Sequence, residues 1–551
     1  MNSVFKLAAS RINLLLFALL AGSCNAADTR PNIMLIVVDD MGYSDIAPFG
    51  GEIKTPNLDA LASSGMRFTD FHTAPSCSPT RSMMFSGTDN HIAGVGSMEE
   101  SLLPNQRGKP GYEGYLNDRV VSIPTLLRDA GYYTAMAGKW HLGDEIDQDP
   151  SRRGFEKVYT MLSGGTSHFD DEWMMYANYT PVYRENGVRV HVPKGFYSSE
   201  FYTSKLIEYL DERPANKPFF GYLSFTAPHD PLHAPDEWIE KYKGKYDAGY
   251  DVLSQTRLKQ LKALGFIDKD AKPFPRLASI SAWEKLTDEQ KKIEARKMEV
   301  YAAMIANIDH NIGRLFKHLK KTGQWDNTLV IFLSDNGANG FEMHQYPDTD
   351  EAWVERNSDN RYENLGRQFS RIATGPAWAQ ASMTPYRMFK AFVAEGGIRS
   401  PLIIAGPGVK KAGSHNGAFS HVMDIAATIL DVSETSHPGT SYKGRVVKPL
   451  RGQSLFPVLS GKANVVYKDD TAVSWELFGM RAVRKGDYKL LRLVKPFGPD
   501  EWQLYNLAND PGEMIDLSKK MPDLHKEMIA TWNRYSRESG VIMPSKNIFA
   551  P

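Results

Sequence analysis

The sequence predicts an α/β protein with a large, mostly parallel or mixed sheet sandwiched by helices. Two apolar runs, at 33–38 and 328–333, lead into acidic residues, the second after one serine, which is typical of strands buried on both faces. Between these runs, strand-like and helical patterns alternate along the chain. Beyond residue 440 the pattern changes to short strand-like runs separated by turns, which predicts a smaller α+β subdomain on an antiparallel sheet.

The elements of the large domain, residues 27–440, follow in a regular order. Further strands are expected at 132–137, 219–226 and 401–405, and helices at 57–64, 122–130, 202–212 and 284–321. Gly65 and Gly131 directly follow the first two helical patterns and are expected to end those helices. Apolar residues recur every three or four positions along 284–321, so this stripe indicates core packing.

The second domain, residues 441–551, is expected to contain a meander closed by a helix at 522–538. Its strands are expected at 472–477, 480–484, 488–493 and 502–505. In the large domain, the polar segments 236–296 and 338–385 are expected to be irregular insertions or rim loops. Trp353, Trp378 and Tyr386, in or just after the second segment, are candidates either for contact with an aromatic or sugar group or for loop packing.

The overall composition is that of an ordinary globular protein. The 551 residues are 42% apolar and 24% charged, and 65 basic residues balance 65 acidic ones. A net charge of zero indicates neither nucleic acid nor a membrane surface as a partner. Local charges must therefore attract any charged substrate.

The first 26 residues are typical of a secretory signal peptide. Lys6 and Arg11 precede the apolar run 14–21, and small residues follow up to Ala26, the expected cleavage site. This predicts export, to the periplasm or the medium. Cys24 offers an alternative, because a cysteine after small residues can carry a lipid anchor. The apolar run is too short for a stable membrane span, and none is expected elsewhere in the sequence.

Cysteine is nearly absent from this chain. Cleavage after Ala26 removes Cys24, so the mature protein keeps only Cys77 and cannot form an internal disulfide. A lone thiol in an oxidising compartment is open to oxidation. Cys77 is therefore either a small buried core residue or a residue with a chemical role.

Four oxygen-bearing side chains follow the two buried runs. Asp39 and Asp40 follow the first run, and Asp335 and Asn336 follow the second. Each pair alone is equally consistent with a cap or a turn. Together, at the carboxyl ends of neighbouring strands, they favour a hard cation, calcium more readily than magnesium. Zinc is disfavoured, because the sequence lacks cysteine or histidine ligands at suitable spacing.

Several basic side chains also follow predicted strands. Lys139 and His141 are expected to point the same way in an extended chain, His229 follows the strand at 219–226, and Lys390 lies further on. In isolation, the default interpretation of each is an exposed residue at a strand end or in a loop. With a cation and an arginine, they suit a tetrahedral oxyanion, which favours phosphoryl or sulfuryl transfer. No Gly-x-Ser-x-Gly elbow or phosphate-binding Gly-rich loop favours another chemistry.

The segment CSPTRSMMFSG, residues 77–87, resembles the signature of the formylglycine-dependent sulfatases. The blocks RPNIMLIVVDD, GKWHLG, APHDPLHAP, LSDNG and KAFVAEGGIRSP are similar to the other conserved blocks of that family and stand in the same order. The similarity covers essentially the whole mature chain and is greatest to bacterial arylsulfatases. It implies an alkaline phosphatase-like fold, with 27–440 as the catalytic domain.

The resemblance further implies a modified residue and a metal ion. A separate maturation enzyme would convert Cys77 to formylglycine (3-oxoalanine), whose hydrate supplies the nucleophile. Calcium would be held by Asp39, Asp40, Asp335 and Asn336 together with the modified residue 77.

Five further residues receive roles by the same resemblance. Arg81 would hold the hydrate, Lys139 would bridge hydrate and sulfate, and His141 would take the proton in the elimination step. His229 and Lys390 would grip the sulfate, and either one would protonate the leaving oxygen.

The expected reaction is hydrolysis of a sulfate monoester, aryl or saccharide, to an alcohol or phenol and inorganic sulfate. A phosphonate monoester or phosphodiester hydrolase on the same scaffold is an alternative. A catalytically silent binding protein is another, although every expected functional residue is present. His233 competes with His229, which is preferred because it directly follows Ala-Pro.

Overall fold

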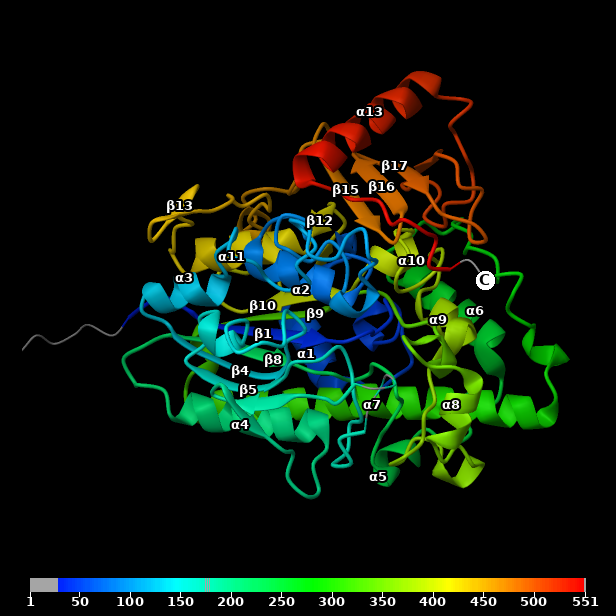
Figure 1. The fold of residues 1–551 in the computed structure, drawn as a ribbon, viewed down its shortest axis with the longest axis horizontal. Helices are drawn as coiled ribbons and strands as arrows, with labels where there is room; N and C mark the ends of the chain where they lie inside the picture. Colours follow the sequence, from blue (N-terminus) through cyan, green and yellow to red (C-terminus); the bar gives the residue numbers. More distant parts are fainter. Residues whose placement is uncertain (1–27, 174, 176, 178, 550–551) are drawn as a thin grey trace, which may run out of the picture.

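The computed structural model describes residues 28–549 except 174, 176 and 178. The predicted signal peptide, 1–26, and the alternative lipid anchor at Cys24 lie outside the described residues. A ten-stranded sheet forms the centre of the molecule, in the order β11-β2-β10-β9-β1-β8-β4-β5-β6-β7 (Figure 1). Helices cover both of its faces, so the predicted fold class is confirmed.

The middle of the sheet is parallel. β1 (Asn32–Val38) lies between β8 (Phe219–Ser224) and β9 (Thr328–Ser334), and β8 continues to β4 (Tyr133–Lys139) and β5 (Lys157–Met161). β1, β4, β8 and β9 are buried along their whole length, as their continuous apolar runs predict. Their carboxyl ends therefore meet at one edge, where a ligand is expected.

Both sides of the sheet depart from the parallel arrangement. β10 (Leu402–Ala405) runs antiparallel to β9 and to β2 (Gly65–Phe68), which pairs with β11 (Ser414–Asn416). At the opposite side, β5 is followed by the antiparallel strands β6 (Tyr183–Glu185) and β7 (Val188–Val190). The sheet is therefore mixed.

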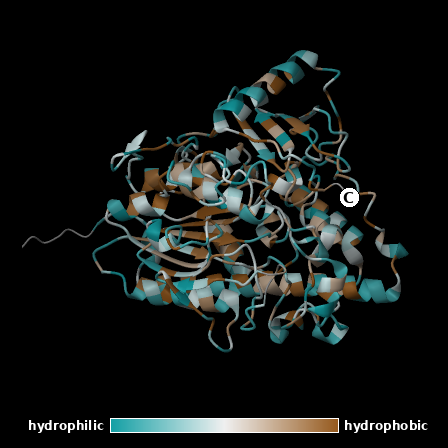
Figure 2. Ribbon diagram, in the orientation of Figure 1, coloured by the Kyte–Doolittle hydropathy of each residue, from teal (hydrophilic) through white to brown (hydrophobic). Residues whose placement is uncertain are grey.

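The helices form two layers around this sheet. α4 (Ser198–Asp211) and α7 (Asp288–Lys321) lie on one face, and α2 (Cys77–Ser86), α3 (Ile123–Asp129) and α11 (Met423–Val432) lie on the other (Figure 1). Figure 2 shows that apolar residues gather in the strands and on the sides of the helices that face them. Across the described residues, no helix combines the length and apolar character that crossing a membrane requires.

The two segments expected to be irregular in fact contain helices. α6 (Gly249–Ala263) lies in the first segment, and α8 (Glu351–Arg356) and α9 (Gly375–Ser382) lie in the second. The buried stripe of α6 includes Arg257, which donates to Glu52 at 2.8 Å. A charged residue in the stripe hid the helical pattern.

The three aromatic candidates of the second segment pack within the protein. Trp378 and Tyr386 are buried in the core, and the Trp353 ring lies 4.5 Å from the guanidinium of Arg371. None of the three lines the cavity described below. Of the two alternatives, packing therefore explains these residues.

The C-terminal region is the predicted antiparallel unit. β15 (Ala472–Leu477), β16 (Met480–Lys485), β17 (Tyr488–Arg492) and β18 (Gln503–Asn506) pair in sequence order, and α13 (Pro522–Ser539) packs on this sheet. Short turns join the first three strands, as a meander requires.

A buried ion network joins this small sheet to the large domain. Lys489 of β17 lies 2.8 Å from a carboxylate oxygen of Glu395 and 2.7 Å from one of Glu513. Glu395 also contacts His72 at 2.9 Å and Arg399 at 3.0 Å. Burial favours a raised pKa for Glu395, but Lys489, His72 and Arg399 reverse this effect and hold the pKa well below its usual range.

Lys489→Met is expected to lower the free energy of unfolding by about 3–5 kcal/mol, because it leaves two buried carboxylates without their shared cation. Lys485→Met is the matched control: it removes a more exposed pair with Glu527, worth at most about 1 kcal/mol. Urea unfolding of both variants measures the difference. Equal small losses would contradict this role for Lys489.

Candidate active site

The predicted acidic residues meet at the carboxyl edge of the sheet. Val38 and Ser334 are direct partners in the β1–β9 pair, so Asp39 and Asp335 follow side by side. The backbone N–H of Asp335 donates to the carbonyl of Val38 at 3.1 Å. Asp40 turns sharply out of the strand, with a φ of 66°. All three carboxylates are buried.

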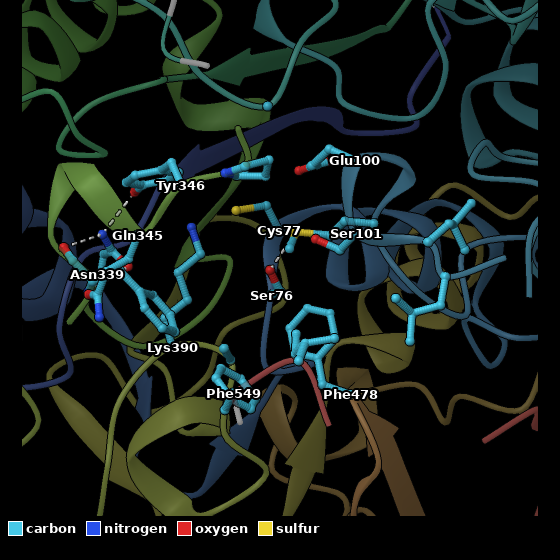
Figure 3. A pocket seen from close by; sticks show the side chains of 18 of the residues that line it. Ser76, Cys77, Glu100, Ser101, Asn339, Gln345, Tyr346, Lys390, Phe478 and Phe549 are labelled. Carbon is cyan, nitrogen blue, oxygen red and sulfur yellow. Dashed lines mark hydrogen bonds between the residues drawn. The ribbon is translucent and has the colours of Figure 1, made fainter. Parts of the chain in front are cut away.

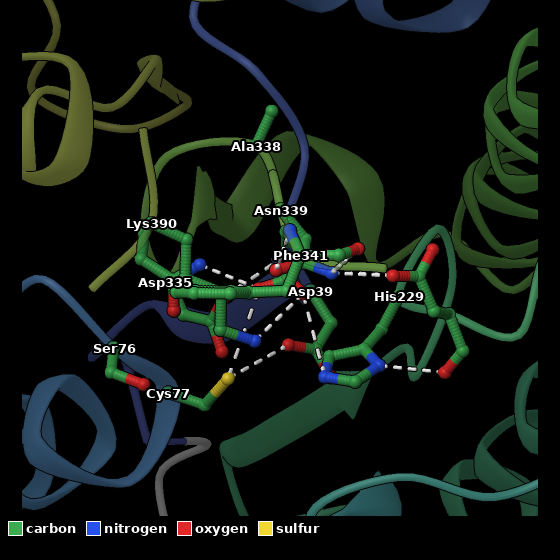
Figure 4. Close-up of polar contacts among 12 residues, drawn as sticks. Asp39, Ser76, Cys77, His229, Asp335, Ala338, Asn339, Phe341 and Lys390 are labelled. Carbon is green, nitrogen blue, oxygen red and sulfur yellow. Dashed lines mark hydrogen bonds and ion pairs between the residues drawn. The ribbon is translucent and has the colours of Figure 1, made fainter. Parts of the chain in front are cut away.

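Cys77 is the first residue of α2 and points at these carboxylates (Figure 4). Its Sγ lies 3.3 Å from Asp39 Oδ1 and 3.8 Å from Asp40 Oδ1. Burial and the charge of Asp39 raise the pKa of the thiol well above its usual value. An unmodified thiol would therefore stay protonated and be a weak nucleophile.

The position of α2 is fixed by close packing at its far end. Gly87 ends the helix with a φ of 64°, a conformation that glycine adopts without strain. A Cβ at this position would come within 2.2 Å of Leu450 and 2.9 Å of Ala426. All ten residues of α2 are buried, so its first residue has a defined direction.

Arg81 lies one turn after Cys77 on α2, and all three nitrogens of its guanidinium donate hydrogen bonds to residues at the sheet edge. Its Nε and Nη2 donate to Asp335 Oδ2 at 3.0 and 2.8 Å. Its Nη1 donates to Tyr222 Oη at 3.1 Å and to Ser224 Oγ at 2.7 Å. The sequence analysis did not identify Tyr222 and Ser224. The available signal was their spacing, because residues two apart near the end of a buried strand point to the same face.

The two predicted lysines neutralise the other two carboxylates. Lys139 Nζ donates to Asp39 Oδ2 at 2.6 Å, and Lys390 Nζ donates to Asp40 Oδ2 at 2.8 Å. Burial favours a lower pKa for each lysine, but the neighbouring carboxylate outweighs it and raises the pKa. With Arg81, three cations thus face three carboxylates.

His229 reaches the same group of charges. Its Nε2 lies 3.4 Å from Asp40 Oδ2, and its Nδ1 donates to the carbonyl of Asp230 at 2.7 Å. Burial and the charge of Lys390 lower its pKa to about 4, so the ring is neutral. His233 instead hydrogen-bonds to a backbone carbonyl at 2.9 Å, away from the carboxylates.

His141 lies just beyond the end of β4. The expectation that Lys139 and His141 share an extended strand is wrong, because His141 has a φ of 56° and the strand ends at Lys139. His141 Nε2 contacts Glu100 at 3.4 Å. Burial favours a raised pKa for Glu100, but His141 reverses this and lowers the pKa to about 2. No motif marks Glu100, so sequence reasoning missed it.

Four non-glycine residues near the site have left-handed backbone conformations. They are Asp40, His141, Met388 and Ala391, with φ of 66°, 56°, 63° and 75°. Each such conformation costs on the order of 1–3 kcal/mol. Residues of this kind cluster where a fold holds functional side chains in fixed directions.

The oxygen donors fit a hard cation. Asn336 Nδ2 donates to Asp40 Oδ1 at 2.6 Å, while Asn336 Oδ1 is buried without a hydrogen-bond partner among the described residues. Ligand atoms of Asp39, Asp40, Cys77 and His229 lie within 4.8 Å of one another. An unpaired amide oxygen beside convergent carboxylates is the donor set that calcium or magnesium takes.

A cavity of about 620 Å³ opens over Cys77 (Figure 3). His141, His229 and Lys390 also line it, whereas Arg81 and Lys139 lie beneath its floor, against the carboxylates. The structure therefore brings together all the side chains that the sequence singled out as catalytic or metal-binding.

Family models match both parts of the chain. The sulfatase model matches residues 31–435, and a model described as the C-terminal region of N-sulphoglucosamine sulphohydrolase matches residues 386–537. Together these matches span the sheet edge, the antiparallel unit and most residues that line the cavity, but not the last lining residues, among them Phe549.

Individual proteins are similar over nearly the same length. An uncharacterised sulfatase of Schizosaccharomyces pombe is 46% identical, covering 94% of this chain and 95% of that protein. An arylsulfatase of Klebsiella aerogenes is 44% identical, covering 81% of this chain and 95% of that protein. The solved structure of Ps i-CgsB with k-i-k-neocarrahexaose has the same fold, with a TM-score of 0.67, 24% identity and 94% coverage of each chain. The chain therefore belongs to the sulfatase family of sulfuric ester hydrolases.

Proposed function

We propose that this sulfatase is of the arylsulfatase type and releases an alcohol or phenol and inorganic sulfate. One observation carries the proposal: Cys77 begins a buried helix at the floor of the cavity, facing three carboxylates and three cations. The helix N-terminus adds positive potential where negative charge develops on the sulfate. The likeness to the Klebsiella aerogenes arylsulfatase supports the same reaction.

We propose that a separate maturation enzyme converts Cys77 to formylglycine. The raised pKa of the thiol supports this step, because the unmodified side chain would supply little thiolate. Hydrated formylglycine would supply one hydroxyl that displaces the alcohol from sulfur, and a second whose deprotonation would expel sulfate and restore the aldehyde. Arg81 and Lys139 hold this residue against the sheet edge.

We also propose calcium, rather than magnesium, as the bound ion. Asp39, Asp40, Asp335 and Asn336 would hold it together with the modified residue 77. When bound, the ion supplies positive charge that polarises the sulfate oxygens. The protein side chains alone are balanced, three negative against three positive, so a divalent cation makes the floor attractive to an anionic ester.

The remaining side chains move protons and orient the ester. His141 lines the cavity beside Cys77 and takes the proton during elimination. Glu100 contacts His141 and orients its ring. His229 and Lys390 also line the cavity, where they would grip the sulfate, and one of the two would supply the proton to the leaving oxygen. We further propose that the enzyme acts after export, in the periplasm or the medium.

Matured protein is expected to hydrolyse an aryl sulfate faster than the corresponding aryl phosphonate monoester. Both esters are tetrahedral monoanions, but the sulfate presents three non-bridging oxygens to the charged floor of the cavity, whereas the phosphonate presents two oxygens and a carbon substituent. Parallel kcat/KM measurements on protein made with and without a maturation enzyme test this, and the unmatured preparation is the control. Faster turnover of the phosphonate would favour the alternative hydrolase. No turnover of either ester by fully matured protein would favour a silent binding protein.

A further inference from the structure

The end of the chain returns to the active-site cavity. After α13 it runs back toward α10 (Glu395–Ile398) and the large domain (Figure 1). Ile542 exchanges hydrogen bonds with Tyr112 Oη at 2.9 and 3.0 Å, and Asn105 Nδ2 donates to the carbonyl of Met543 at 2.8 Å. Asn547 Nδ2 donates to another backbone carbonyl at 2.7 Å. These bonds fix the course of the segment.

Phe549, near the end of this segment, packs in a cluster of aromatic rings. The Phe549 ring stacks on Phe341 and Phe392, with centroids 6.3 and 5.7 Å apart and interplanar angles of 8° and 17°. It meets Phe478 and Phe497 edge to face, at 5.9 and 5.3 Å. Such pairs favour a single arrangement of the rings.

Four of these rings form one wall of the cavity. Phe341, Phe478, Phe497 and Phe549 line it together with Cys77. Figure 3 shows Phe478 and Phe549 on the opposite side of Cys77 from Glu100 and Tyr346. The cavity therefore has a charged floor for the sulfate and an apolar wall beside it, where the rest of the ester must lie.

Two amides that line the same cavity offer few acceptors for sugar hydroxyls. Asn339 Oδ1 accepts from the backbone N–H of Phe341 at 3.4 Å, and its Nδ2 donates to Asp230. Gln345 Oε1 accepts from the backbone N–H of Glu342 at 2.8 Å. Other polar side chains, such as Ser101 and Lys546, line the cavity elsewhere. Directly against the four phenyl rings, however, the hydroxyls of a saccharide would lose water without a partner, whereas a flat apolar group would not.

We propose that Phe549 and the C-terminal segment form the leaving-group subsite and select sulfate esters of flat, apolar alcohols over saccharide sulfates. This inference rests on the proposed function, because it assigns the cavity to a sulfate ester. The aromatic wall that Phe549 completes packs against the ring of the alcohol, while Lys390 and His229 hold the sulfate. Specificity thus comes partly from the second domain, distant in sequence from the catalytic residues.

Calorimetric binding to Cys77→Ala protein tests the subsite without requiring turnover or maturation. In this background, Phe549→Ala is expected to raise the Kd of para-nitrophenyl sulfate about tenfold, the loss of one aromatic contact. The Kd of inorganic sulfate should stay unchanged, because sulfate uses only the charged floor. Phe549→Leu, which keeps an apolar side chain of similar reach, should weaken aryl binding by a smaller factor.

Phe369→Leu is the matched control, since Phe369 is 47% exposed, packs on Trp173 and does not line the cavity. It should leave both Kd values unchanged. Equal affinity for the aryl sulfate with and without Phe549, or parallel weakening of both ligands, would overturn the inference. Failure of the proposed function would give a different result. The Kd of the aryl sulfate would still rise in the Phe549→Ala variant, but matured wild-type protein would not hydrolyse this ester.

Discussion

Cys77→Ala is expected to lower the kcat for an aryl sulfate by about 10⁵-fold or more, as loss of a nucleophile does in other hydrolases. Among the described residues, Cys77 is the only cysteine, and it alone combines the first position of α2 with contacts to both Asp39 and Asp40. Without it, Arg81 and Lys139 still form the charged floor but have no reacting group to hold. Steady-state kinetics on an aryl sulfate measures the loss.

The fold should survive this change. Alanine removes one sulfur atom and keeps the start of α2, so thermal unfolding should shift by only a few degrees. Ser78→Ala is the matched control: its Oγ is buried without a partner among the described residues, and Pro79 and Arg81 stay in place. It should retain turnover. Retained turnover in Cys77→Ala would contradict the proposed nucleophile.

Asp335→Asn is expected to remove the bound cation and lower kcat by at least about 10³-fold, because a metal ion contributes several kcal/mol to charge stabilisation. The same change leaves the buried guanidinium of Arg81 without its carboxylate, which costs about 3–5 kcal/mol of stability. Metal content, measured by mass spectrometry of purified protein, gives a readout that does not depend on turnover. Chelation of wild-type protein should lower activity in the same way, and calcium should restore it.

Asp309→Asn provides the matched control for a buried carboxylate outside the site. Asp309 accepts from the backbone N–H of Leu58 at 2.8 Å and caps α1 (Pro56–Ser64). Its replacement should lower stability by about 1 kcal/mol and leave metal content and kcat unchanged. A full equivalent of cation in active Asp335→Asn protein would contradict the assigned ligand set.

Much of the fold was predictable because its signals are local. The continuous apolar runs of β1 and β9 indicate strands buried on both faces, and the apolar stripe of α7 indicates a long packed helix. The antiparallel direction of β10 was not predictable, since a buried strand has the same composition in either direction. α6 was missed because Arg257 occupies a core position, and its partners Asp45 and Glu52 lie far away in sequence.

In the active site, too, the residues with local sequence signals were predictable, and those that depend on distant contacts were not. Asp39 and Asp335 were expected to lie close together, because each follows a buried strand and parallel strands end at the same edge of a sheet. Glu100 and Phe549 could not be predicted, since their proximity to Cys77 depends on how a single-turn helix and the end of the chain pack against the sheet edge. The direction of His141 was mispredicted because a left-handed residue interrupts the strand pattern.

Mass spectrometry of the peptide that contains residue 77, from protein expressed in its native host, tests the central claim most directly. The proposal predicts formylglycine or its hydrate at this position, with Pro79 and Arg81 unmodified. Protein that turns over an aryl sulfate at full rate while carrying only an unmodified cysteine at position 77 would contradict it.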